Sequence, residues 1–185
     1  MDKLLSRKIH LSSDGNYIAY LINNADIFTM DHLHTFRGAE NIVDFCFSPI
    51  NREQIVALAG KEKFSNTGIV NVYDMNDYEW FNKKQNSSQH PLLCATFDQL
   101  TTSVSWLEFS RDAQLLAMGS IVKKMSVRLG HCVSGTVFQN FPSKQEHFSK
   151  ERLTTCTFSP KGAFFSVGAK EGRTRLYQLK NFKNY

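Results

Sequence analysis

The chain has 185 residues, a length that suits one domain or a small domain with a tail. Apolar residues make up 42% of it and aromatic residues 12%, which excludes a disordered polar segment. No run approaches the roughly 20 apolar residues of a membrane-spanning helix, and residues 1–8 lack the apolar core of a secretory signal. The composition therefore predicts a soluble intracellular protein with a packed core.

Charge is unevenly distributed along the chain. Residues 1–92 carry 9 Lys and Arg against 11 Asp and Glu, whereas residues 93–185 carry 13 against 6. The net charge is therefore −2 in the first half and +7 in the second, within a total of +5. A basic half favours polyanionic partners, because each neutralised phosphate releases counterions. On charge alone, a basic domain that binds no nucleic acid is an equal alternative.

The cysteines show no pattern of disulfides or metal ligands. The chain has four of them, at positions 46, 94, 132 and 156. They form no C-x-x-C pair and no metal-ligand spacing with the six His residues. Cys46 and Cys156 each lie within an apolar stretch. Free thiols in a reducing compartment are therefore expected.

One short phrase recurs along the chain, in which an apolar residue and Ser lead into a turn. Its four copies begin at Leu11, Phe47, Phe109 and Phe158. In the last copy, Phe158-Ser159-Pro160-Lys161-Gly162, proline presets the turn and glycine suits a positive φ. A short alternating stretch precedes the second to fourth copies, and a small apolar run follows every copy. Strand–turn–strand units are therefore expected.

These units predict an all-β fold in a single repeat domain, residues 1–185, with units at residues 9–38, 39–80, 92–141 and 150–180. The serines are 36, 62 and 49 residues apart, and WD40 blades repeat about every 40–45 residues. Polar loops at residues 76–91 and 142–152 explain the two longer intervals. The sequence therefore predicts a WD40-like β-propeller of about four blades.

The repeat departs from WD40 blades in detail. Where a Trp-Asp pair would close a blade, the chain has Tyr73-Asp74 and Tyr177-Gln178. Propellers usually close 4–8 blades into a ring. Blades of this type are wedge-shaped for rings larger than four, so an open arc within a larger propeller is expected. A longer chain is favoured over closure against another chain, because residues 1–8 do not read as a polar cap.

Three phrases in the last third are more specific than the general repeat. They are Ser126-Val127-Arg128-Leu129, the segment from Gly135 to Pro142 and the segment from Gly172 to Leu179. Their order resembles the C-terminal blades of the U3 small nucleolar RNA-associated protein 18 family, WD-repeat components of the small-subunit processome. The resemblance covers about residues 10–185, with specific phrases only in residues 104–179.

The resemblance implies a non-catalytic scaffold in ribosome biogenesis, located in the nucleus and nucleolus and needed in the U3 snoRNP for pre-18S rRNA processing. It implies other processome proteins as partners, and U3 snoRNA or pre-rRNA as a contact of a basic face. It implies no cofactor, no membrane and no small-molecule substrate. The alternative is a generic WD40 protein-interaction scaffold outside the nucleolus.

No catalytic constellation is present. The chain has no G-x-x-x-x-G-K-[ST] and no G-x-S-x-G motif, so an enzyme is not expected. The Asp31-His32-Leu33-His34 segment could offer metal ligands, but a surface hairpin is favoured because no third ligand is evident. Gly168 to Gly172 is likewise favoured as a hairpin turn over a phosphate loop.

Basic side chains are the candidate functional residues. If their loops share one rim of a propeller, they offer a phosphate-binding patch that positions RNA without reading sequence. A solvated basic face is the alternative. The candidates are Lys123, Lys124, Arg128, Lys161, Lys170, Arg173 and Arg175.

Overall fold

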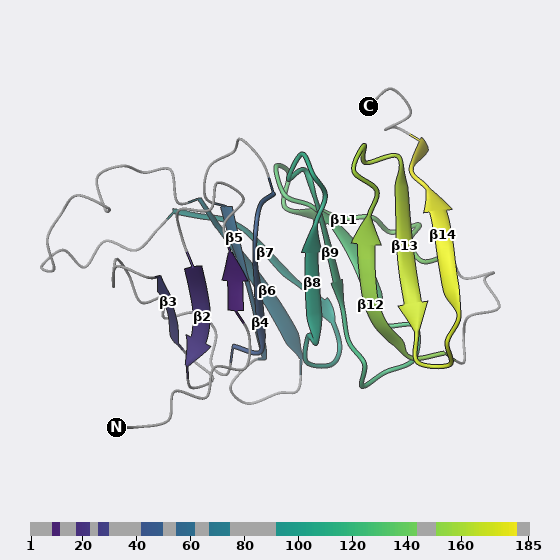
Figure 1. The fold of residues 1–185 in the computed structure, drawn as a ribbon, viewed down its shortest axis with the longest axis horizontal. Helices are drawn as coiled ribbons and strands as arrows, with labels where there is room; N and C mark the ends of the chain where they lie inside the picture. Colours follow the sequence, from purple (N-terminus) through teal and green to yellow (C-terminus); the bar gives the residue numbers. More distant parts are fainter. Residues whose placement is uncertain are drawn as a thin grey trace, which may run out of the picture.

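A computed structural model describes most of the chain. The described residues are 9–11, 18–22, 26–29, 42–49, 55–61, 67–74, 92–143 and 151–180. They form fourteen strands in four antiparallel sheets and contain no α-helix (Figure 1). The same residues hold no apolar helix long enough to cross a bilayer. The prediction of an all-β fold is confirmed.

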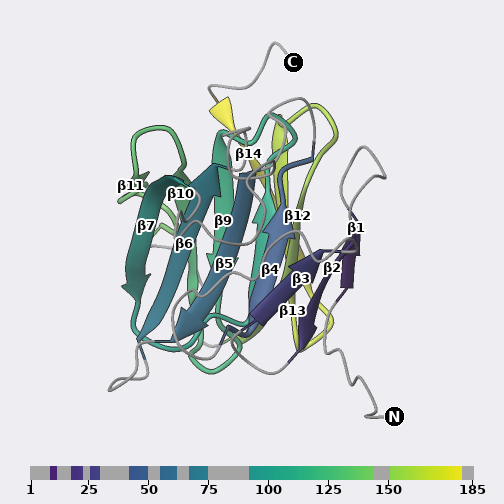
Figure 2. The same ribbon diagram turned by 90° about the vertical axis from the view of Figure 1, so that its left-hand side faces the viewer.

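The first two sheets come from the first hundred residues. The first sheet contains β1 (Ile9–Leu11), β2 (Ile18–Ile22) and β3 (Asp26–Thr29) in that order. The second contains β4 (Asp44–Phe47), β5 (Ile55–Lys61), β6 (Gly68–Asp74) and β7 (Leu92–Leu100). Figure 2 shows these four strands side by side in chain order.

The remaining two sheets are the best described. The third contains β8 (Trp106–Phe109), β9 (Leu115–Gly119), β10 (Val127–His131) and the short β11 (Thr136–Val137). The fourth contains β12 (Leu153–Phe158), β13 (Phe164–Ala169) and β14 (Thr174–Gln178). Every neighbouring pair is antiparallel, as expected where each strand returns along the one before it.

Strand β7 belongs to a different unit from the one that the sequence predicted. The sequence placed residues 92–100 in the third unit, but the structure pairs them with β6, from Gly68 opposite Leu100 to Asp74 opposite Leu92. Consecutive strands of a meander pair with each other even across a long connection, so β7 completes the second sheet. Residues 76–91, expected as a loop, lie outside the described residues, as do residues 144–150 of the second expected loop.

The repeated serine phrase forms the predicted turns in the third and fourth sheets. The Ser110 amide donates to Leu115 O (2.8 Å), and the Ser159 amide donates to Phe164 O (2.8 Å). In return, the Leu115 amide donates to Ser110 Oγ (2.9 Å). The Phe164 amide donates to Ser159 Oγ (3.0 Å) in the same way. The serine therefore closes the turn with both its backbone and its side chain.

Sheets pack face to face, and two apolar clusters hold the last three together. Leu116 and Met118 of the third sheet pack with Val70 and Phe97 of the second. On its other face, the third sheet packs against the fourth; this second cluster includes Leu115, Ala117, Leu129, Phe165 and Val167. All five residues of β9 are buried, since this strand has a sheet on each side. Burial of each large side chain contributes about 1.5–3 kcal/mol.

The first strands of the sheets also lie next to one another. Strand β8 contacts both β4 and β12. The buried Asp44 on β4 accepts a hydrogen bond from the Leu107 amide at Oδ2 (3.0 Å), and the Trp106 indole Nε1 donates to Leu153 O of β12 (3.3 Å). Antiparallel sheets stacked with their first strands adjacent are consistent with a β-propeller-like fold. The blade count and the WD40 type stay predictions.

Candidate nucleic-acid interface

Strand direction brings several basic loops to one end of the molecule. In Figure 1, β8, β12 and β14 run upward, whereas β9 and β13 run downward. The loop of residues 120–126 and the turn of residues 170–173 therefore share the lower end. The Met125 amide donates to Glu151 O (3.0 Å) and the Lys170 amide to Arg152 O (2.8 Å), so both connect to the residues that lead into β12. We call residues 120–126, 151–152 and 170–173 the basic end.

Four of the seven candidate residues lie at this basic end. Lys123, Lys124, Lys170 and Arg173 are all exposed. The Lys123 ammonium donates to Thr101 Oγ1 (3.2 Å), which directs it toward the loop before β8. Within the part of the chain that the structure describes, Lys124 and Lys170 make no side-chain hydrogen bond or ion pair. Their charges are therefore available to an anionic partner.

Arg173 is partly committed to an ion pair. Its Nη1 donates to Glu151 Oε1 at 2.7 Å. The Arg173 side chain is 71% exposed, whereas that of Glu151 is only 8% exposed. The guanidinium thus has one edge on a buried carboxylate and the rest in solvent.

Arg128 and Arg175 occupy equivalent places on strands rather than on the end loops. Arg128 is the second residue of β10, and Arg175 is the second residue of β14. Both are half-buried. Arg128 donates to Val127 O (2.8 Å), and Arg175 lies opposite Val167 on the face that meets the third sheet. Since side chains alternate along a strand, neither projects from the basic end as the loop lysines do.

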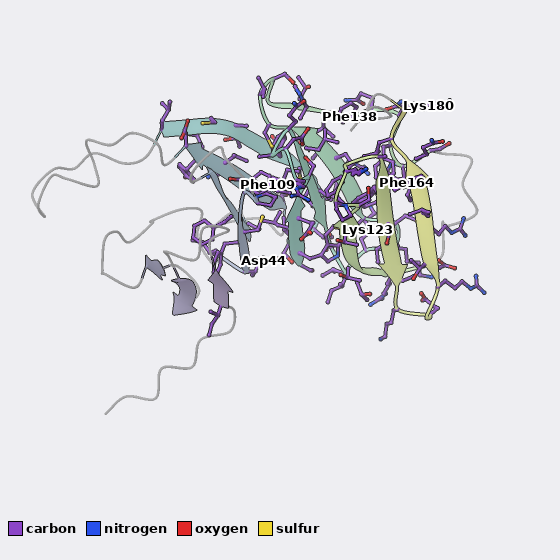
Figure 3. The ribbon with its side chains drawn as sticks, turned by 45° about the horizontal axis from the view of Figure 1, so that its top comes forward. Asp44, Phe109, Lys123, Phe138, Phe164 and Lys180 are labelled. Atoms are coloured by element: carbon purple, nitrogen blue, oxygen red, sulfur yellow. The ribbon has the colours of Figure 1, made fainter. Side chains whose placement is uncertain are left out.

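Lys161 lies at the opposite end of the sheets. It belongs to the turn between β12 and β13, whereas Lys170 belongs to the next turn, and successive turns of a meander lie at opposite ends. The neighbouring Arg111 donates to Pro160 O (3.5 Å) at this upper end. Lys180 also lies there, well above Lys123 in Figure 3. The seven candidates therefore do not form one surface.

Sequence reasoning missed two features of the site. Arg152 is exposed and adds a further cation to the basic end. Glu151 is 6% exposed and acidic, so no search for basic side chains would have found it. Their position immediately before β12 could have revealed them. A residue that directly precedes a strand lies at the same end of the sheet as the turn beside the start of that strand.

A separate cleft lies between the third and fourth sheets at the upper end. Its volume is about 430 Å³, and its lining includes Leu129, Phe138, Phe141, Tyr177 and Lys180. Phe138 and Lys180, both labelled near the top of the molecule in Figure 3, line this cleft. The cleft holds none of the seven predicted cations, so it is distinct from the basic end.

The described residues offer neither a metal site nor a reactive thiol in the core. They contain no cluster of three or more His, Cys, Asp or Glu side chains that could hold a metal. The His32 and His34 pair lies outside the described residues. All four cysteines are free. Burial, with the charges of Asp112 and Cys94, raises the pKa of the Cys132 thiol to about 12. Burial, with the charges of Glu108 and Asp44, also raises the pKa of Cys156.

The described residues form an all-β protein, consistent with a β-propeller-like fold, in which four of the seven candidate cations share one end. Sequence comparison then identifies its relatives. The chain is 39% identical over 118 residues to U3 small nucleolar RNA-associated protein 18 of Saccharomyces cerevisiae. It is 30% identical over 180 residues to the homolog of Arabidopsis thaliana and 28% identical over 182 residues to that of Homo sapiens. All three relatives carry the name U3 small nucleolar RNA-associated protein 18, and the latter two match almost the whole chain.

The matches cover this chain far better than they cover the relatives. The alignments include 64% of the chain for the yeast protein, 96% for the Arabidopsis protein and 97% for the human protein. They include only 18%, 31% and 29% of those relatives. The chain thus spans less than a third of the length of these relatives. No protein-family model matches the chain.

Proposed function

We propose that the chain is a non-catalytic scaffold of the U3 snoRNP and small-subunit processome, acting in the nucleolus in pre-18S rRNA processing. The observation that carries this proposal is the similarity to U3 small nucleolar RNA-associated protein 18 relatives over most of the chain. The relatives are named for association with U3 small nucleolar RNA, and none of these names gives an enzymatic activity.

We further propose that the basic end is the surface that contacts U3 snoRNA or pre-rRNA. Lys124 and Lys170 are exposed cations without a partner in the described structure, and Lys123, Arg152 and Arg173 belong to the same basic end. Cations on loops of a rigid sheet scaffold contact phosphates and position RNA without reading its bases. Other processome proteins would dock on the remaining surface.

We infer that the four sheets are WD40-like blades. Two of them share the same serine-closed turn between their first two strands. Buried apolar layers join the last three sheets, as radially packed blades require. The proposed role as a scaffold follows from this architecture, because a rigid stack of sheets holds loops of several blades at fixed positions on one end.

The test compares two triple variants with the same change in charge. The lower-end variant carries Lys123→Glu, Lys124→Glu and Lys170→Glu. The upper-end control carries Arg111→Glu, Lys161→Glu and Lys180→Glu. Tagged chains are expressed in cells of their source, and the U3 RNA recovered with each is quantified. We expect recovery to fall by about fivefold or more for the lower-end variant only, because each lost phosphate contact weakens binding.

Other outcomes distinguish the alternatives. Equal losses for both variants would mean that overall charge, rather than the basic end, governs recovery. Normal recovery for both, with nucleolar localisation retained, would leave a scaffold that acts through protein contacts alone. Localisation outside the nucleolus without U3 RNA would instead support the generic protein-interaction scaffold.

A further inference from the structure

A buried carboxylate lies within the basic end. Glu151 is 6% exposed, and its Oε1 accepts from Arg173 Nη1 at 2.7 Å. Its other oxygen, Oε2, is buried and has no hydrogen-bond partner in the described part of the chain. Buried polar atoms are normally satisfied, so an unpartnered carboxylate oxygen is a feature that needs an explanation. Among the described residues, Arg173 is the cation that forms an ion pair with Glu151.

Arg173 presents its remaining donors outward. A guanidinium carries five N–H donors in a fixed plane. The structure uses one of them on Glu151, and the side chain is 71% exposed. An arginine held at one edge by a carboxylate has lost part of its conformational freedom before it meets a ligand. Its outer edge is therefore pre-oriented for the two parallel hydrogen bonds that a phosphate accepts.

Glu151 also connects the two basic loops. Its carbonyl oxygen accepts from the Met125 amide (3.0 Å) in the loop that carries Lys123 and Lys124. Its side chain holds Arg173 in the turn that carries Lys170. Met125 has a positive φ of 54°, a conformation that a non-glycine residue adopts only when its surroundings hold it. Glu151 thus contacts both loops, one through its carbonyl oxygen and the other through its carboxylate.

We propose that Arg173 and Glu151 form an organised phosphodiester-binding site at the basic end, in which Arg173 contacts the phosphate and Glu151 is its positioning residue. This inference rests on the proposed contact with RNA. It adds that an acidic side chain strengthens binding of a polyanion. General electrostatics predicts the opposite, because removing a negative charge from a basic surface tightens nonspecific binding.

The test uses Glu151→Gln and a matched control, Glu171→Gln. Both remove one carboxylate from the same end, but Glu171 is exposed and forms no ion pair with a described residue. Affinity of the 185-residue chain for a fluorescent single-stranded RNA is measured by anisotropy at several salt concentrations. We expect Glu151→Gln to bind about three- to tenfold more weakly, with a salt slope smaller by about one phosphate contact. Glu171→Gln should bind slightly more tightly.

A second pair of variants distinguishes a loss of RNA binding from a loss of folding. Arg173→Lys keeps the positive charge but removes the planar guanidinium, so this variant should also bind RNA more weakly. Its control, Lys170→Arg, should not. Arg173 is exposed, so this substitution leaves the core intact. Thermal melting checks that every variant is folded.

The outcomes separate this inference from the proposed function. If both glutamine variants tighten binding alike while Arg173→Lys binds normally, the basic end is a plain electrostatic surface and the organised site is overturned. If the unchanged chain does not bind RNA, the proposed RNA contact fails and this site fails with it. A Glu151→Gln loss that persists when Arg173 is also replaced would show that Glu151 acts through another group.

Discussion

The third and fourth sheets share a design but differ in what covers them. Both have the serine-closed turn, and both bury the face that meets the preceding sheet, through Leu116 and Met118 in one and Phe165 and Val167 in the other. On the opposite face, Leu129 is 4% exposed, whereas Leu176 at the equivalent place is 67% exposed. Similar residues in equivalent strands therefore contribute differently to stability, because only the third sheet has a neighbour on both sides.

The largest expected effect comes from truncating these two leucines. Leu129→Ala removes buried methyl groups from the layer between the sheets and should lower the free energy of unfolding by about 2–4 kcal/mol. Leu176→Ala should change it by less than about 0.5 kcal/mol, because its side chain is already in solvent. Urea denaturation of both variants measures the difference. Equal losses would mean that the face of β14 is covered in solution.

Two equivalent glycines give the next comparison. A Cβ at Gly119 would overlap the indole ring of Trp106, whereas one at Gly168 would lie 3.0 Å from the Thr155 methyl group. Gly119→Ala should therefore cost about 1–3 kcal/mol, since the buried Trp106 must move. Gly168→Ala should cost less than about 1 kcal/mol, since exposed Thr155 can rotate. Melting temperatures of the two variants test this order, and a reversal would contradict the placement of Trp106.

The serine turns should show a smaller difference. Ser110 is 2% exposed, and its Oγ also donates to Asp112 Oδ1 (2.6 Å). Ser110→Ala should cost about 1–2 kcal/mol because it leaves a buried amide unsatisfied. Ser159→Ala should cost about 0.5 kcal/mol, because water can replace its hydroxyl at a more exposed turn. Denaturant midpoints provide the measurement. Equal costs would show that exposure does not distinguish the turns.

The smallest effect concerns the reactivity of the cysteine thiols. Burial raises the pKa of Cys132 to about 12 and also raises the pKa of Cys156. Burial and the charge of Asp74 raise the pKa of Cys94 too, but its side chain is exposed. At pH 8, an aromatic disulfide reagent should label Cys94 first, the partly exposed Cys156 more slowly and the buried Cys132 only on unfolding. The raised pKa of Cys132 favours the folded state below its ordinary value of 9.0, and this contribution is lost as the pH rises toward 12. Rapid native labelling of Cys132 would contradict this.

Much of the fold could be predicted from local patterns. The phrase around Ser110 and Ser159 predicted both turns, and glycine at position 162 does take a positive φ of 70°. The equivalent Ala113 also has a positive φ, 56°, which its side chain disfavours and which no local rule would predict. The partner of β7 could not be predicted either, because alternation shows that a segment is a strand without showing which strand it joins.

The candidate site was less predictable than the fold. Charged segments that lack alternating apolar residues form exposed connections between strands. Local patterns therefore predicted that the candidate lysines lie in loops and turns. They could not assign Lys161 and Lys170 to opposite ends, because that depends on the direction of each strand in its sheet. Nor could they pair Arg173 with Glu151, which lies 22 residues away in the chain.

The sequence by itself determined that this protein is a repeat of short strands, that a serine phrase leads into its turns and that its second half is basic. These properties depend on neighbouring residues and on composition. Only the tertiary structure decided which cations share an end, which equivalent leucine is buried and that an acidic residue holds Arg173 in place. These depend on how sheets stack and in which direction each strand runs, and both are set by contacts between residues far apart in the chain.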